Sequence, residues 1–92
     1  MFVKILMEVM EDKNMSLQKV SLSDIRDVSR SELDSHRLNT LENGYSSFEE
    51  VLNSSSDPIK LDGIKPYDIT DGRHRIYLAR QKGYSYVYTI LN

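Results

Sequence analysis

The chain contains no cysteine. Disulfide bonds, thiolate zinc sites and a cysteine nucleophile are therefore excluded, and the cellular compartment cannot be read from cysteine usage. We take a cytoplasmic location as the default expectation.

The chain also lacks a long hydrophobic run. Its apolar first ten residues include Lys4 and Glu8, and they have neither the length nor the small-residue cleavage site of an export signal. No later stretch is long and apolar enough to span a bilayer. We therefore expect no membrane partner.

Neither sign of charge dominates, because 12 basic residues stand against 14 acidic ones and the net charge is -2. Such a chain has no overall field to attract nucleic acid, so binding of this kind would need a local basic patch. Glycine and proline are sparse, and 39% of the residues are hydrophobic, which is typical of a globular protein. The 92 residues predict a single domain over 1–92.

Hydrophobic periodicity predicts a small α+β domain. The predicted strands are Phe2–Val9, Leu17–Leu22, Ile59–Leu61, Tyr67–Thr70 and Tyr84–Leu91. The first of them is also compatible with a helix, and as a strand it would pair with the second in a hairpin. The predicted helices run from Ser31-Glu32-Leu33 to about Glu42, from Phe48 to Asn53 after a serine cap, and from Arg73 to Lys82 before Gly83.

The candidate functional residues lie where the predicted strand Tyr67–Thr70 gives way to the predicted helix that begins at Arg73. Asp71 and Gly72 end a strand, and Arg73, His74 and Arg75 occupy the first turn of the helix that follows. This is the unfavourable end of a helix for cations unless an anion is bound there. Because the first N–H groups of a helix have no internal partner and glycine exposes the backbone, the segment predicts a phosphate site.

Spacing alone is equally consistent with a purely structural role. In that interpretation Asp71 caps the helix and Gly72 makes the turn. The three basic side chains are then solvated or paired with carboxylates.

Two segments resemble the core of the ParB/sulfiredoxin superfamily. They are Asp57–Leu61 (DPIKL) and Tyr67–Ala79 (YDITDGRHRIYLA), followed by Gly83 and a β-rich end. In that family a "PI.V" strand precedes a strand that ends in DG-x-HR. The resemblance covers roughly Lys19 to Ile90, and it implies a mixed sheet with about three helices. It also implies that the turn from Gly72 to Arg75 contacts the phosphates of a nucleotide such as ATP, ADP or CTP, with Mg²⁺ as a possible companion.

This sequence differs from the known branches of the superfamily, and the differences exclude some of the activities that the resemblance would otherwise imply. Sulfiredoxins have a reactive cysteine where this chain has Arg73, so their repair chemistry is not expected. ParB partition proteins carry further nucleotide-contacting helices and a DNA-binding helix-turn-helix domain, so a complete partition protein is not expected either.

Carboxylates supply the candidate catalytic groups. Free-serine kinases of the same superfamily have a carboxylate near the start of the first helix that acts as base, and Glu32 lies at a similar place. An ordinary glutamate that complements the helix dipole is the stronger expectation there. Asp71, with Asp68, could hold a metal as in nuclease members of the superfamily, although aspartates at a strand end are more often turn residues. His36 and His74 are too few for a convincing zinc site.

Four of the six tyrosines fall between Tyr77 and Tyr88. They could stack on a base or form a partner surface, but packing is the more common use.

Two functions remain open from the sequence. One is a nucleotide-binding domain with phosphoryl-transfer or hydrolytic activity, and the other is a nonenzymatic regulatory module that binds a protein or DNA partner.

Overall fold

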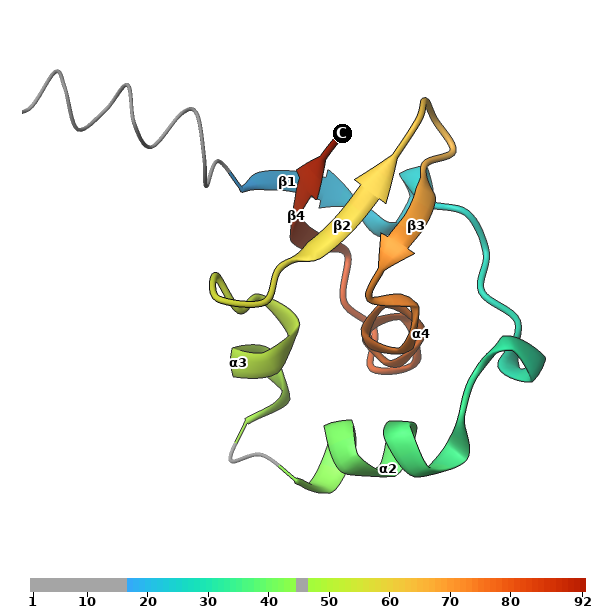
Figure 1. Cartoon of the computed structure of the whole chain (residues 1–92), viewed down its shortest axis with the longest axis vertical. Helices are drawn as coiled ribbons and strands as arrows, with labels where there is room; N and C mark the ends of the chain where they lie inside the picture. The colour runs from blue at the N-terminus through green and yellow to red at the C-terminus, as the bar shows by residue number, and fades with distance from the viewer. Residues whose placement is uncertain (1–16, 45–46) are drawn as a thin grey trace, which may run out of the picture.

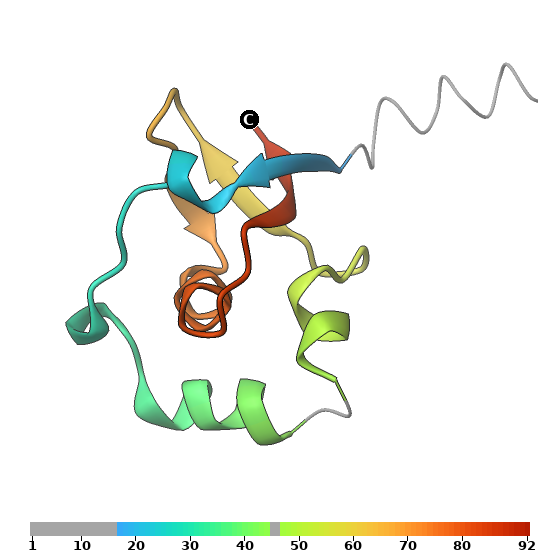
Figure 2. The same cartoon turned by 180° about the vertical axis from the view of Figure 1, so that it is seen from behind.

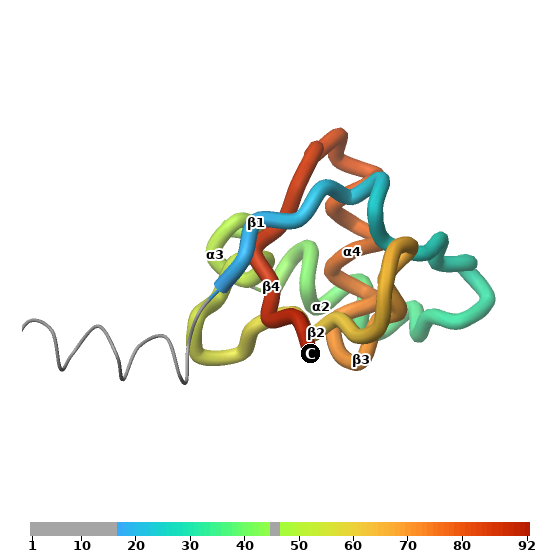
Figure 3. The backbone as a smooth tube through the Cα atoms, turned by 90° about the horizontal axis from the view of Figure 1, so that it is seen from above, coloured from blue at the N-terminus to red at the C-terminus, as the bar shows by residue number. Residues whose placement is uncertain are grey.

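The computed structural model describes residues 17–44 and 47–92, which build a four-stranded mixed sheet in the order β1-β4-β2-β3. The strands are β1 (Gln18–Ser21), β2 (Ile59–Asp62), β3 (Asp68–Asp71) and β4 (Tyr86–Leu91). β1 pairs with β4 and β2 with β3 in antiparallel fashion, whereas β2 and β4 run parallel. β4 therefore lies between β1 and β2 (Figure 3). The strand predicted at Phe2–Val9, and its hairpin, lie outside the described residues.

Three α-helices accompany the sheet, and they confirm the predicted α+β fold (Figure 1). They are α2 (Ser35–Asn43), α3 (Phe48–Leu52) and α4 (Arg73–Gln81), with two short 3₁₀ helices, η1 (Leu22–Asp24) and η2 (Arg30–Glu32). α4 lies between the sheet and α2 in opposite views (Figures 1 and 2). Within the described residues, no helix is long and apolar enough to cross a membrane.

The core forms where the sheet packs against α4. Residues alternate along β2, so that Ile59 and Leu61 are fully buried while their neighbours face solvent. Ile76 and Ala79 of α4 are also fully buried in this cluster. A second cluster joins α2 to α4. Its buried members are Leu38, Leu41 and Leu78. Helix α4 is therefore shared by both clusters.

The first predicted helix begins later than expected. The chain forms one 3₁₀ turn at η2, continues through Leu33 in an extended conformation, and starts α2 only at Ser35. Ser29 and Glu32 complete a capping box around η2, and Asp34 then caps α2 by accepting a hydrogen bond from the Arg37 N–H. Two caps in succession interrupt what periodicity predicts as one helix. The other predicted helices and strands within the described residues agree to within two residues at each end.

Candidate functional site

Gly72 forms the turn between β3 and α4. Its φ of 111° lies in the left-handed region, and a Cβ placed there would be 2.9 Å from Cγ1 of Ile59. The turn therefore needs glycine both for its conformation and for close packing against β2. Gly72 itself is the N-cap of α4, and no side chain in the described part of the chain caps the helix. Asp71 thus does not cap the helix.

A pocket of about 260 Å³ opens at this turn, between the start of α4 and the face of α2. Its lining residues are Arg37, Leu41, Asp71, Gly72, Arg73, His74 and Arg75. It brings together all the predicted site residues except Glu32, and it adds two from α2. In the sequence, the clue to Arg37 is that a cation stands next to the apolar stripe that contains Leu38 and Leu41.

His74 joins the two helices that border the pocket. Its side chain is 8% exposed, and Nε2 accepts a hydrogen bond of 3.0 Å from the backbone N–H of Asp34. The ring is therefore neutral, with its proton on Nδ1. Burial lowers the pKa of His74, and the charges of Arg73 and Arg37 lower it further, against a smaller opposing effect of Asp34.

The lowered pKa of His74 predicts that the protein loses stability on mild acidification. The unfolded chain, with a histidine pKa of about 6.5, binds a proton more readily than the folded chain, so the free energy of unfolding falls as the pH drops below about 6.5. We expect the melting temperature of the wild type to decrease between pH 7.5 and pH 5.5. The measurement is thermal unfolding followed by circular dichroism.

Two variants separate His74 from other groups. His74→Gln, which keeps a hydrogen-bond acceptor, should flatten this pH dependence, whereas His36→Gln on the exposed side of α2 should leave it unchanged. The lowered pKa values of Glu32 and Asp68 affect stability only below about pH 4.5, outside this window. An equal slope in wild type and His74→Gln would contradict the assignment.

Arg75 is buried, with 6% of its surface exposed. Its Nη1 donates hydrogen bonds to the carbonyl oxygens of Val51, at 3.1 Å, and Asp57, at 2.7 Å. These bonds connect α4 to α3 and to the loop before β2. The guanidinium therefore has a structural task in addition to lining the pocket, and its role as a phosphate ligand stays a prediction.

Arg73 and Arg37 are the exposed cations of the pocket. Arg73 Nε donates one bond of 3.2 Å to the carbonyl oxygen of Glu32. Because their guanidinium groups lie at the surface, both side chains can reorient toward a ligand at little cost in packing. They are the residues of this site whose charge is most readily available to an anion.

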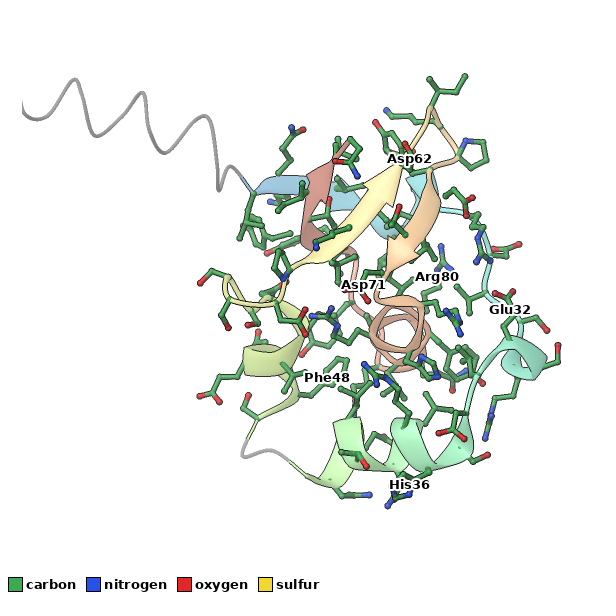
Figure 4. All side chains as sticks on the ribbon, in the orientation of Figure 1. Glu32, His36, Phe48, Asp62, Asp71 and Arg80 are labelled. Carbon is green, nitrogen blue, oxygen red and sulfur yellow. The ribbon has the colours of Figure 1, made fainter. Side chains whose placement is uncertain are left out.

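Glu32 lies apart from the pocket, at η2 (Figure 4). Its carboxylate accepts hydrogen bonds from both Nη atoms of Arg26 and from the backbone N–H of Ser29. The bonds from Arg26, followed by that from Ser29, lower the pKa of this carboxyl. These contacts favour the structural interpretation of Glu32, and its role as a general base stays a prediction.

The two aspartates of β3 have different surroundings. Asp68 accepts a hydrogen bond of 2.8 Å from Nε of Arg26, whereas Asp71 lines the pocket. Across residues 17–44 and 47–92, no group of three or more His, Asp or Glu side chains could hold a metal ion. Asp71 is the one carboxylate among the residues that line the pocket.

A second hollow of about 240 Å³ continues from the pocket along α2. The two share Arg37 and Leu41, and the second is also lined by Asp34, His36 and Thr40. The two hollows are thus neighbours along the surface of α2.

No protein-family model matches this chain, and no curated protein is found to be similar to it.

Proposed function

We propose that the pocket at the start of α4 binds the phosphate group of a nucleotide. The observation that carries this proposal is that a nine-residue helix begins, without a side-chain cap in the described structure, at a pocket lined by three arginines. The partial positive charge of the helix start and the arginine charges act on the same small volume. One acidic side chain, Asp71, opposes them. The resemblance to the ParB/sulfiredoxin superfamily supports the same ligand.

The size of the pocket limits what it encloses. Pockets for small organic ligands usually have volumes of about 300 to 1,000 Å³. At about 260 Å³, the pocket suits one or two phosphate groups rather than a whole nucleotide. The nucleoside would then lie outside, along the hollow that borders α2.

Nucleotide binding is better supported than transfer or hydrolysis of the phosphate group. A phosphoryl-transfer enzyme needs a base or a metal-binding carboxylate at the reacting atoms. Asp71 is the one carboxylate among the lining residues, and Glu32 is held by Arg26. We therefore favour a nucleotide-binding regulatory module, and an enzyme that hydrolyses or transfers the phosphate is the alternative.

Replacing Arg73 with alanine should weaken phosphate binding. The loss of one charge-assisted contact corresponds to about 1 to 3 kcal/mol, or roughly 5- to 150-fold in Kd. Calorimetry with pyrophosphate, ATP, ADP, CTP and GTP, each with and without Mg²⁺, measures the effect directly. Thermal shifts give an independent measure, because a ligand that binds only the folded state raises the melting temperature.

Arg37→Ala should act in the same direction, and Arg30→Ala is the matched control. Arg30 is also an exposed arginine, but it does not line the pocket. Unchanged affinity in both Arg73→Ala and Arg37→Ala, or no binding by the wild type, would refute the site. Release of phosphate by the wild type, reduced in Asp71→Asn or Glu32→Gln at unchanged affinity, would instead support an enzyme.

A further inference from the structure

The pocket at the start of α4 contains a carboxylate as well as its arginines. Asp71 is the last residue of β3, and Figure 4 labels it where that strand meets α4. A carboxylate repels an anion bound at the same place, because the two charges have the same sign. Its presence therefore restricts which phosphate-bearing ligands the pocket can hold.

The carboxylate of Asp71 has no partner in the described part of the chain. It forms no ion pair and no side-chain hydrogen bond there, although three arginines line the same pocket. Lys60 lies opposite Asp71 in the register of β2 and β3, but the two side chains form no ion pair. Because Asp71 is exposed, both carboxylate oxygens are available to accept hydrogen bonds from a ligand.

His74 offers the pocket an unused hydrogen-bond donor. The residue is 92% buried, and its Nε2 already accepts the N–H of Asp34, whereas its Nδ1–H has no acceptor among the described residues. Thr89 Oγ1 is the one fully buried side-chain polar atom without a partner in that part of the chain, so Nδ1 of His74 is open to solvent. Since His74 lines the pocket, this donor and the arginines can bind oxygens of the same ligand.

We propose that Asp71 selects a phosphate group that carries a proton, by accepting a hydrogen bond from its O–H while the arginines and His74 donate to its other oxygens. An ionised carboxylate can only accept hydrogen bonds, so a ligand without an O–H leaves Asp71 facing negative oxygens. A ligand with an O–H instead forms a short charge-assisted bond with it.

This inference rests on the proposed function, and it narrows the class of ligand. A phosphate monoester takes up its second proton at a pH of about 6, and free phosphate keeps an O–H at neutral pH. Sulfate and the ionised oxygens of a phosphodiester carry no proton under these conditions. The pocket therefore suits free phosphate or the terminal phosphate of a nucleotide, and it disfavours the backbone of a nucleic acid.

The test compares inorganic phosphate with sulfate by calorimetry at pH 7.5 in metal-free buffer. Both are mainly tetrahedral dianions at this pH, but only hydrogenphosphate has an O–H group. The wild type should bind phosphate about 5- to 20-fold more tightly than sulfate, in the lower part of the range for an unsatisfied charged group because Asp71 is exposed. Asp71→Asn, whose amide can donate to sulfate, should lose most of this preference.

Asp62→Asn is the matched control, because it removes the same charge from β2 at a position that does not line the pocket. It should leave the ratio of the two affinities unchanged. Lys60→Gln should leave the ratio unchanged too, because Lys60 does not hold the carboxylate of Asp71. Melting temperatures of all variants, compared with the wild type, show that they are folded.

The outcomes separate this inference from the proposed function. No binding of either anion by the wild type would refute the phosphate pocket and the role of Asp71 with it. Equal affinity for the two anions, or the same preference in Asp71→Asn as in the wild type, would overturn the role of Asp71 and leave the pocket intact. A preference for phosphate that appears only after Mg²⁺ is added would show that Asp71 acts through a metal ion, and it would overturn the inference too.

Discussion

Replacing Gly72 with valine is expected to lower the free energy of unfolding by about 2 to 5 kcal/mol. A residue with a Cβ in the left-handed region costs about 1 to 2 kcal/mol, and overpacking a filled core adds about 1 to 3 kcal/mol. Both terms apply at Gly72, because its φ is 111° and Ile59, its nearest neighbour across the turn, is fully buried. Urea denaturation of wild type and variant measures the difference.

Gly83 provides the matched control for the Gly72 turn. It also has a positive φ, of 84°, but a Cβ there would meet nothing within 4 Å. Gly83→Ala should therefore show only the conformational cost, and Gly72→Ala should be the more destabilising by the cost of displacing Ile59. Equal effects of the two alanine substitutions would mean that β2 yields easily and that the turn is not closely packed.

Much of the fold follows from local sequence signals. The strand predicted at Ile59–Leu61, directly after Pro58, corresponds to β2, and the Asp71-Gly72 pair correctly predicts where β3 gives way to α4. Such signals act between neighbouring residues, so they can be recognised without a structure. The predicted start of the first helix is wrong for a local reason as well, because the capping box of η2 at Ser29 and Glu32 is followed at once by a second cap at Asp34, where α2 begins.

The candidate site is harder to predict, because tertiary packing assembles it. Arg37 reaches the pocket through the packing of α2 on α4, and the hydrogen bond from Asp34 to His74 joins residues 40 positions apart. The interaction between Glu32 and Arg26 likewise depends on how the loop before η2 folds back. None of these contacts has a sequence period from which it could be inferred.

The structure gives a reason other than anion binding for two of the three basic residues in the first turn of α4. Three basic residues at the start of α4 suggest an anion, yet Arg75 finds its acceptors in two backbone carbonyl groups and His74 is neutral. Arg80, further along α4, binds carbonyl oxygens in the same manner. Its three acceptors are the carbonyl groups of Leu22, Ile25 and Arg26. Two arginines of helix α4 thus bind backbone carbonyl groups in other parts of the fold, and Arg73 is the exposed cation of its first turn.

Replacing Arg75 with methionine is expected to lower the free energy of unfolding by about 2 to 4 kcal/mol. Methionine fills much of the same space, but it leaves the carbonyl groups of Val51 and Asp57 without the charged donor that now binds them. A hydrogen bond to a charged group contributes about 1.5 to 3 kcal/mol, and an unsatisfied buried acceptor costs about 1 to 3 kcal/mol. Chemical denaturation measures this loss.

Arg73→Met is the matched control, because the same substitution at an exposed position should change stability by no more than about 0.5 kcal/mol. The pair also separates fold from binding. A stable Arg75→Met protein that has lost phosphate affinity would contradict the structural role, and it would make Arg75 chiefly a ligand of the anion. A destabilised Arg75→Met protein that still binds phosphate when folded, beside a stable Arg73→Met protein that does not, would assign the anion to Arg73 and the helix start.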